Sequence, residues 1–128
     1  MVVNQSRSKQ KETGAKYKDF RKKRKSDSGG RPVMTKLGEN KTKNVRTLGG
    51  NSKTKLQYGD TVNVFDAKEK KSVTLKIKAV VENPANRHYV RRNVITKGTI
   101  VETEKGKAKI TSRPGQDGAL SAVFVSGK

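Results

Sequence analysis

The sequence contains no cysteine and no tryptophan, and it has a single histidine among its 128 residues. The absence of cysteine excludes a disulfide framework, thiol catalysis and a cysteine zinc site, and one histidine cannot build a histidine-rich metal centre. The longest apolar run, Ala122–Val125, is far shorter than the ~20 residues that span a bilayer, and the first residues lack the apolar stretch of a secretory signal. We therefore expect a soluble intracellular protein with no membrane partner, no cofactor and no metal site.

Acidic and apolar residues are also scarce. Asp and Glu number 11 against 31 Lys and Arg, which gives a formal net charge of +20. Hydrophobic residues make up 30% of the chain and aromatic residues 5%, whereas ordinary domains contain roughly 45–50% apolar residues. A positive charge of this size strains a compact state by self-repulsion. A polyanion is needed to offset it, and nucleic acid is the leading candidate.

The charge and the apolar residues are unevenly distributed along the chain. Residues 1–55 carry a net charge of +13 and 11 apolar residues, while residues 56–128 carry +7 and 27 apolar residues. The first part cannot bury enough apolar surface to offset its backbone entropy. We therefore expect residues 1–44 to form a basic extension that becomes ordered on nucleic acid, and residues 45–128 to form the folded domain.

Alternating side chains in the second part predict β-strands. Ser72–Glu82 places Val73, Leu75, Ile77, Ala79 and Val81 on one face, and a period of two is typical of a half-buried strand. Further strands are predicted at Val45–Leu48, Thr61–Phe65, Asn93–Thr103, Lys107–Thr111 and Ala119–Val125. Short antiparallel strands joined by brief turns favour a mostly β fold with a small antiparallel β-barrel, because closure removes exposed strand edges.

The run Arg21–Lys25 is the sharpest local feature of the first part. Five adjacent cations are consistent with a solvated tail, a nuclear-localisation cluster or a nucleic-acid arm. The arm is favoured because the basic residues continue well beyond the run. The predicted RNA-binding residues of this part are Arg7, Lys9, Lys11, Lys16, Tyr17, Lys18, Arg21, Lys22, Lys23, Arg24, Lys25, Arg31, Lys36, Lys41, Lys43, Arg46, Lys53 and Lys55. Tyr17 has two open interpretations, stacking on an unpaired base and packing against the barrel.

A second basic cluster lies between the predicted strands of the folded part. The predicted RNA-binding residues here are Arg87, His88, Arg91, Arg92 and Arg113. Arginine presents a planar fork that binds phosphate with two hydrogen bonds and stacks on bases. His88 is interpreted as a polar neighbour in this cluster rather than as a catalyst, since no second histidine or nearby nucleophile accompanies it. No catalytic residue is predicted.

With these segments located, the sequence resembles the archaeal and eukaryotic type of small-subunit ribosomal protein eight, a family distinct from the bacterial protein eight. The strongest resemblance runs through Glu82–Gly98, Ile100–Thr103 and Thr111–Gly118, and the first half agrees at Thr13-Gly14, Arg21–Lys25, Gly30–Pro32, Thr35–Gly38, Val45–Thr47 and Gly49–Asn51. The short length resembles the archaeal form. Departures at Ala15, Ser26–Ser28 and Leu48 affect local contacts only.

The resemblance implies a β-barrel with a basic extension, bound to small-subunit ribosomal RNA in the cytoplasmic ribosome beside neighbouring ribosomal proteins. It implies a structural role in translation, with no enzymatic activity and no small-molecule substrate. We expect the barrel to dock through Arg87–Arg92 and Arg113 while the extension threads between RNA helices. The main alternative is a chromatin-type protein that compacts nucleic acid in general, and an enzyme acting on RNA is the third class.

Overall fold

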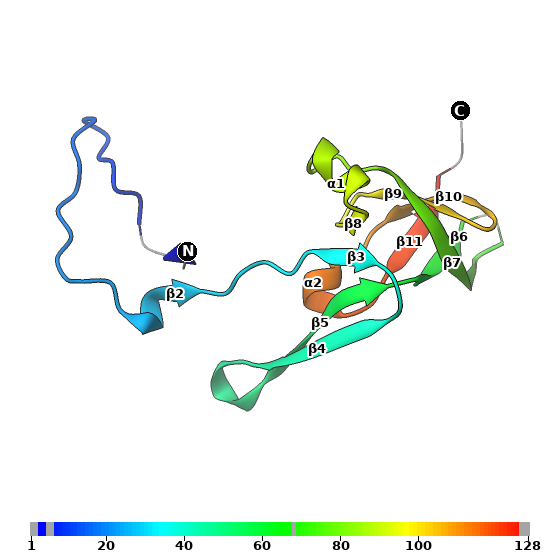
Figure 1. The fold of residues 1–128 in the computed structure, drawn as a ribbon, viewed down its shortest axis with the longest axis horizontal. Coiled ribbons are helices and arrows are strands. Elements are labelled where there is room, and N and C mark those ends of the chain that lie inside the picture. The colour runs from blue at the N-terminus through cyan, green and yellow to red at the C-terminus, as the bar shows by residue number, and fades with distance from the viewer. Residues whose placement is uncertain (1–2, 5–6, 68, 126–128) are drawn as a thin grey trace. The chain divides into compact units, whose positions relative to one another are not determined.

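The computed structural model describes residues 3–4, 7–67 and 69–125, and the chain divides into two compact units, Met1–Pro32 and Val33–Lys128. The sequence places the end of the extension at residue 44, whereas the structure assigns residues 33–44 to the C-terminal unit, where they contribute strands to a sheet. Whether residues 1–44 become ordered together on RNA stays a prediction. Figure 1 shows the ribbon of both units.

The N-terminal unit has little regular structure. Its elements are β1 (Val3–Asn4), a 3₁₀ turn (Lys25–Asp27) and β2 (Ser28–Gly29). β1 and β2 pair antiparallel, with Val3 opposite Gly29, so the pairing closes the intervening chain into a large loop. All residues described between positions 7 and 26 are exposed, as expected for a segment with few apolar side chains.

The C-terminal unit contains a closed five-stranded barrel. Its strands are β6 (Thr61–Asp66), β7 (Lys71–Glu82), β9 (Ile100–Thr103), β10 (Gly106–Ile110) and β11 (Ser121–Phe124), in the order β10-β11-β6-β7-β9. The predicted small barrel and mostly β fold are confirmed. One pair differs from the antiparallel expectation, because β11 runs parallel to β6. A closed ring with an odd number of strands cannot alternate direction throughout, so at least one pair must be parallel.

One continuous hydrophobic core fills the barrel. Its buried members are Leu56, Val62, Val64, Leu75, Ile77, Val80, Ile95, Val101, Ala108, Ile110, Leu120 and Ala122. These residues come from seven strands and from the segment before β11. Each large apolar side chain contributes roughly 1.5–3 kcal/mol when it is fully buried. The core therefore gives this unit a rigid scaffold on which charged side chains can be positioned.

The long strand β7 changes its inward face part-way along. Val73, Leu75 and Ile77 point inward as predicted, but Val80 is 6% exposed and Val81 is 40% exposed, the reverse of the expected alternation. The pairing of β7 with β9 shifts register between Ile77 and Ala79 and again between Val80 and Glu82. Such irregularities leave an extra residue unpaired and exchange the two faces of a strand.

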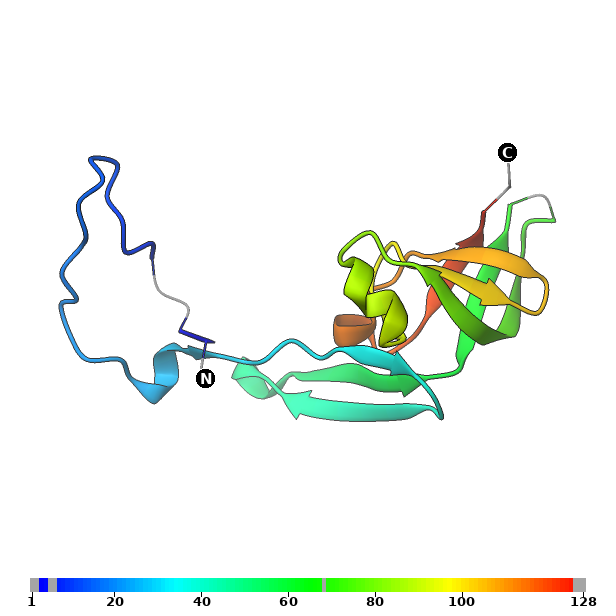
Figure 2. The same ribbon diagram turned by 45° about the horizontal axis from the view of Figure 1, so that its top comes forward.

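A second sheet adjoins the barrel strands in the same unit (Figure 2). It consists of β3 (Thr35–Leu37), β4 (Lys41–Arg46), β5 (Ser52–Gly59) and β8 (Val94–Ile95), in the order β4-β5-β3-β8. β4 and β5 form an antiparallel hairpin, β3 runs parallel to β5, and β8 is antiparallel to β3. The strand predicted at Val45–Leu48 lies earlier in the chain than expected, since Leu48 belongs to the 3₁₀ turn Leu48–Gly50 at the hairpin tip.

Two short helices complete the C-terminal unit, α1 (Arg87–Arg91) and α2 (Pro114–Asp117). The single strand predicted at Asn93–Thr103 is in fact two strands, β8 and β9. A turn separates them, in which the Thr96 backbone N–H donates to Thr99 Oγ1 at 3.0 Å and Gly98 has a φ of +88°. No helix among residues 3–4, 7–67 and 69–125 is long and apolar enough to cross a membrane.

Candidate nucleic-acid interface

The N-terminal unit presents all of its predicted RNA-binding side chains to solvent. The exposed residues are Arg7, Lys9, Lys11, Lys16, Tyr17, Lys18, Arg21, Lys22, Lys23, Arg24, Lys25 and Arg31. The unit contains three acidic residues against 11 Lys and Arg, so the cations outnumber any internal partners. Exposed cations in excess of the carboxylates are available to phosphates, which carry most protein–nucleic acid hydrogen bonds.

A tight turn organises the first of these cations. The backbone N–H of Lys11 donates to Ala15 O at 2.7 Å and that of Tyr17 to Lys9 O at 2.8 Å, while Gly14 adopts a φ of +83°. The Arg7 guanidinium carbon lies 3.7 Å from the centre of the Tyr17 ring. A guanidinium over an aromatic face is attracted by the ring quadrupole. Tyr17 therefore orders Arg7 within its own unit, and base stacking by Tyr17 stays a prediction.

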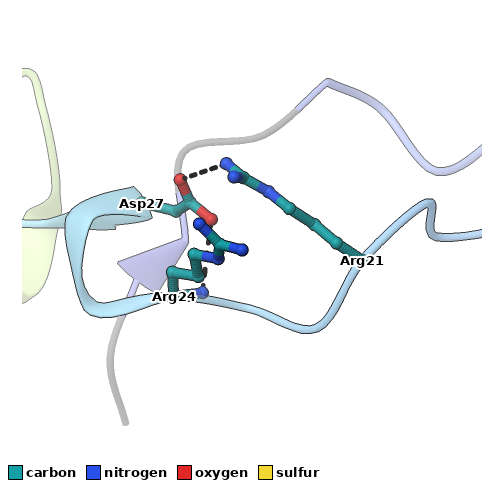
Figure 3. Close-up of polar contacts among 3 residues, drawn as sticks. All are labelled: Arg21, Arg24 and Asp27. Carbon is teal, nitrogen blue, oxygen red and sulfur yellow. Dashed lines mark hydrogen bonds and ion pairs between the residues drawn. The ribbon is translucent and has the colours of Figure 1, made fainter.

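Asp27 organises the run Arg21–Lys25. Figure 3 shows its carboxylate between two arginines: Arg21 Nη2 donates to Asp27 Oδ1 at 3.1 Å, and the backbone N–H of Arg24 donates to Asp27 Oδ2 at 3.3 Å. Within the described part of the chain, Lys22, Lys23 and Lys25 have no ion-pair partner. Asp27 thus fixes the turn after the run and leaves its lysines free for an external anion.

Five lysines share one face of the second sheet, and we call this set the lysine face: Lys36, Lys41, Lys43, Lys53 and Lys55. Directly paired residues in a ladder point to the same side. Lys43 is opposite Lys55 and Val45 is opposite Lys53. Like charges directly opposite one another destabilise a sheet. The arrangement is therefore suited to an anion bound across the two strands.

A β-bulge extends the lysine face to β3. Lys41 pairs with Tyr58 and Thr42 with Leu56, so Gln57 is the extra residue of β5. Without this bulge Tyr58 would share the inward face of Leu56, which is buried in the core. Tyr58 is instead 41% exposed, and it lies between Lys41 of β4 and Lys36 of β3. Arg46 lies three residues after Lys43 in β4, so it points to the face opposite the lysine face. It is exposed near the hairpin tip.

The predicted cluster Arg87–Arg92 forms α1 and its C-terminal cap rather than an irregular loop. Asn86 begins the helix, because its Oδ1 accepts from the His88 backbone N–H at 2.9 Å. Tyr89 and Val90 are half-buried, and the exposed side chains are Arg87, His88, Arg91 and Arg92. α1 contacts β8, the strand that ends the sheet beside β3. Its cations therefore lie at the β8 edge of the sheet that carries the lysine face.

Arg113 is placed separately, at the start of α2. Its backbone N–H donates to Asp117 Oδ2 at 2.8 Å, and its side chain is exposed. α2 packs against β5, and Lys53 Nζ donates to Gln116 Oε1 at 3.3 Å. The helix thus connects Arg113 to the same strand that supplies two members of the lysine face.

Sequence reasoning did not assign several exposed residues to the interface. Lys107 and Lys109 of β10 are exposed on the barrel, and their alternation with buried residues could have identified them. Tyr58 was also missed, because its exposure depends on the bulge at Gln57. Among the described residues, no group of three or more His, Asp or Glu side chains is arranged to hold a metal ion.

Comparison with known proteins relates both units to one family. Residues 4–125 match the family model described as Ribosomal protein S8e. A "Small ribosomal subunit protein eS8" of Methanococcoides burtonii is 47% identical over 121 residues, which cover 94% of this chain and 97% of the relative. A protein of the same description from Methanosarcina barkeri is 45% identical over 94% of this chain and 97% of the relative. Another from Nanoarchaeum equitans is 49% identical over 88% of this chain and 89% of the relative.

Proposed function

The chain belongs to the ribosomal protein S8e family, and from this premise we propose that it is a structural constituent of the small ribosomal subunit that binds and stabilises small-subunit ribosomal RNA. Its role in translation is to hold RNA segments in place rather than to catalyse a reaction. It resides in the cytoplasmic ribosome, where ribosomal RNA and neighbouring ribosomal proteins are its partners.

The observation that carries this proposal is the lysine face. Lys43 and Lys55 are opposite one another on adjacent strands, and Lys36 and Lys41 flank Tyr58 on the same side. A folded domain that keeps like charges in register gains stability when phosphates lie between them. The exposed cations of α1 continue the positive charge at the β8 edge of the same sheet.

The two units contribute differently to binding. The C-terminal unit docks as a rigid body, because its core fixes the strands that carry the lysine face. The N-terminal unit supplies 11 Lys and Arg on a nearly coreless segment, which follows RNA phosphates and becomes fully ordered on them. Double-stranded RNA is recognised mostly through shape, phosphates and 2′-hydroxyls, and the Ser, Thr and Asn residues between the cations are suited to such contacts.

A salt titration of binding to small-subunit ribosomal RNA tests this function. With about 6–10 phosphate contacts, the affinity falls by roughly 10³–10⁵-fold between 50 and 200 mM salt. The protein also co-sediments with the small ribosomal subunit. A flat salt response would contradict the electrostatic account.

The same binding assay distinguishes the ribosomal function from the chromatin-type alternative. A chromatin-type compacting protein binds duplex DNA of equal length as tightly as ribosomal RNA and does not co-sediment with ribosomes. The ribosomal function requires tighter binding to the structured RNA, because the spacing of cations across β3, β5 and β4 is fixed by the sheet.

A further inference from the structure

A hollow of about 420 Å³ opens beside the lysine face and is lined by Glu39, Asn40, Lys41 and Tyr58. Its volume falls in the range of pockets that hold small organic groups, roughly 300–1,000 Å³. Three of its lining residues come from the connection between β3 and β4 and the start of β4, and Tyr58 comes from β5. The hollow thus combines an aromatic ring, a carboxylate, an amide and a cation.

The Tyr58 ring lies beside Gly38. A Cβ added at Gly38 would lie 3.4 Å from Tyr58 Cδ1, so the ring fills the space that a side chain there would need. The neighbouring strands fix its position, because Tyr58 pairs with Lys36 on one side and Lys41 on the other. An exposed ring held in this way is a stacking platform for an unpaired base, since every base has a π face.

Asn40 is also held in place. Its Nδ2 donates to Thr61 Oγ1 at 3.0 Å, and its Oδ1 lies 3.4 Å from the position that a Cβ at Gly59 would occupy. Asn40, the residue before β4, is therefore tied to Thr61 at the start of β6. The hollow keeps its shape because both of its walls belong to the folded unit.

Glu39 determines which ligand fits. It is the single acidic residue between Lys36 and Gly59, and no cation of the described chain lies within ion-pair distance of it. A carboxylate accepts hydrogen bonds only, so it repels phosphate and favours a ligand with two adjacent donors. Guanine offers such a pair on its Watson–Crick edge, N1–H and the N2 amino group, whereas adenine, cytosine and uracil do not.

We propose that this hollow binds an unpaired guanine base of the RNA, stacked on Tyr58 with its N1–H and N2–H groups donating to the Glu39 carboxylate. Lys36 and Lys41 bind the phosphates on either side of the flipped nucleotide. The proposal rests on the RNA-binding function and adds a base-specific site to a surface that otherwise contacts the backbone. Sequence-specific RNA recognition generally uses unstacked bases in this way.

The test uses the full chain and 3′-labelled heptanucleotides, measured by fluorescence anisotropy in low salt. The probes are uridine heptamers with a central guanosine, adenosine, inosine or 7-deazaguanosine, and all-uridine RNA. We expect about tenfold tighter binding of the guanosine probe, the scale of a good two-hydrogen-bond contact to a base. The inosine probe, which lacks the N2 amino group, should lose most of this preference, and 7-deazaguanosine should retain it.

Variants test whether the hollow causes the preference for the guanosine probe. Glu39→Gln should abolish the guanosine preference without weakening binding of all-uridine RNA, because the amide places a donor against the guanine donors. Tyr58→Thr should weaken binding of the guanosine probe, and Tyr58→Phe should not. Phe65→Thr is the matched control, since Phe65 has the same 41% exposure but lies on the barrel strand β6. An unchanged NMR amide spectrum outside the hollow checks that each variant is folded.

Two results overturn the proposal: equal affinity for guanosine and adenosine probes, or a guanosine preference that survives Glu39→Gln. These outcomes are distinct from failure of the ribosomal function. If that function is wrong, the wild-type chain does not co-sediment with the small ribosomal subunit and binds duplex DNA as tightly as ribosomal RNA. If only the guanine site is wrong, binding stays salt-dependent and lacks base preference.

Discussion

Single residues decide where the short helices and turns can pack. Gly118 has a φ of +71°, and a Cβ added there would lie 2.7 Å from Thr54 Cγ2 and 3.2 Å from Thr54 O. Glycine is thus required twice, for the left-handed backbone and for the close approach of α2 to β5. Asn83 is 4% exposed and stabilises the chain reversals on both sides of α1.

Gly118→Ala is expected to lower the free energy of unfolding by about 2–5 kcal/mol. The left-handed conformation contributes about 1–2 kcal/mol of this cost, and the overlap with Thr54 contributes typically 1–3 kcal/mol. Urea denaturation followed by circular dichroism measures the change. Gly30→Ala is the control, because Gly30 lies outside the left-handed region and nothing lies within 4 Å of the added Cβ. Equal stability of the two variants would contradict the packing of α2 against Thr54.

Asn83→Ala is expected to destabilise the C-terminal unit by about 2–4 kcal/mol, because truncation leaves buried groups unpaired. Asn83 Nδ2 donates to Val94 O at 3.1 Å, and its Oδ1 accepts from the Ala85 N–H and from Thr96 Oγ1, each at 3.0 Å. Thermal unfolding of the full chain measures the loss. Asn63→Ala removes only one exposed hydrogen bond, from Thr74 Oγ1 at 2.8 Å on β7, and should cost no more than about 1 kcal/mol.

At the scale of elements, the alternation of side chains predicts β6 and β10 closely, because each has one face in the core and one in water. β5 was missed because its first four residues, Ser52–Lys55, carry no apolar side chain and the strand is stabilised by β4 and α2. The face exchange in β7 and the exposure of Tyr58 both arise from irregular pairing, which follows from tertiary contacts rather than from local pattern. Charged residue types predict an interface, but only the register shows which lysines share one face of the sheet.

One prediction at the scale of elements concerns the lysine face. Lys43→Gln combined with Lys55→Gln should reduce the salt dependence of RNA binding by about two units of slope, one for each phosphate contact. The same variant should be slightly more stable without RNA, by about 0.2–1 kcal/mol at low salt, since a like-charge pair has been removed.

The matched control for this pair is Lys76→Gln with Lys78→Gln, two exposed lysines of β7 on the barrel. It removes the same total charge from a different surface. If both double variants reduce the salt dependence of RNA binding equally, the lysine face does not contribute more to binding than the barrel surface does.

At the scale of the whole molecule, the charge divides into two units with different physical properties. The N-terminal unit has net +8 over 32 residues and no buried side chain among those described, whereas the C-terminal unit contains the complete barrel core. The family match extends over both, from residue 4 to 125. Composition predicts a basic part without a core followed by a folded part. The boundary between the two units of the structure lies between Pro32 and Val33, because strands β3 and β4 contain few apolar residues and gain stability from pairing with β5.

Removal of residues 1–32 is expected to leave a chain that unfolds cooperatively at nearly the same urea midpoint, because every residue of the barrel core is retained. The shortened chain should bind small-subunit RNA more weakly and with a clearly smaller salt slope, since 11 cations are lost. Denaturation and filter binding measure the two effects. Loss of cooperative unfolding would show that the N-terminal unit is needed for the fold.

The parallel pairing of β11 with β6 has a consequence for biosynthesis. β11 lies between β6 and β10 in the ring, with Ser121 opposite Asn63, so the barrel cannot close before the last strand has been translated. Contacts between such distant segments form slowly because a long loop must first be ordered. During synthesis the basic N-terminal unit therefore emerges well before the C-terminal unit can fold. It is free to bind RNA while the rest of the chain is still being translated.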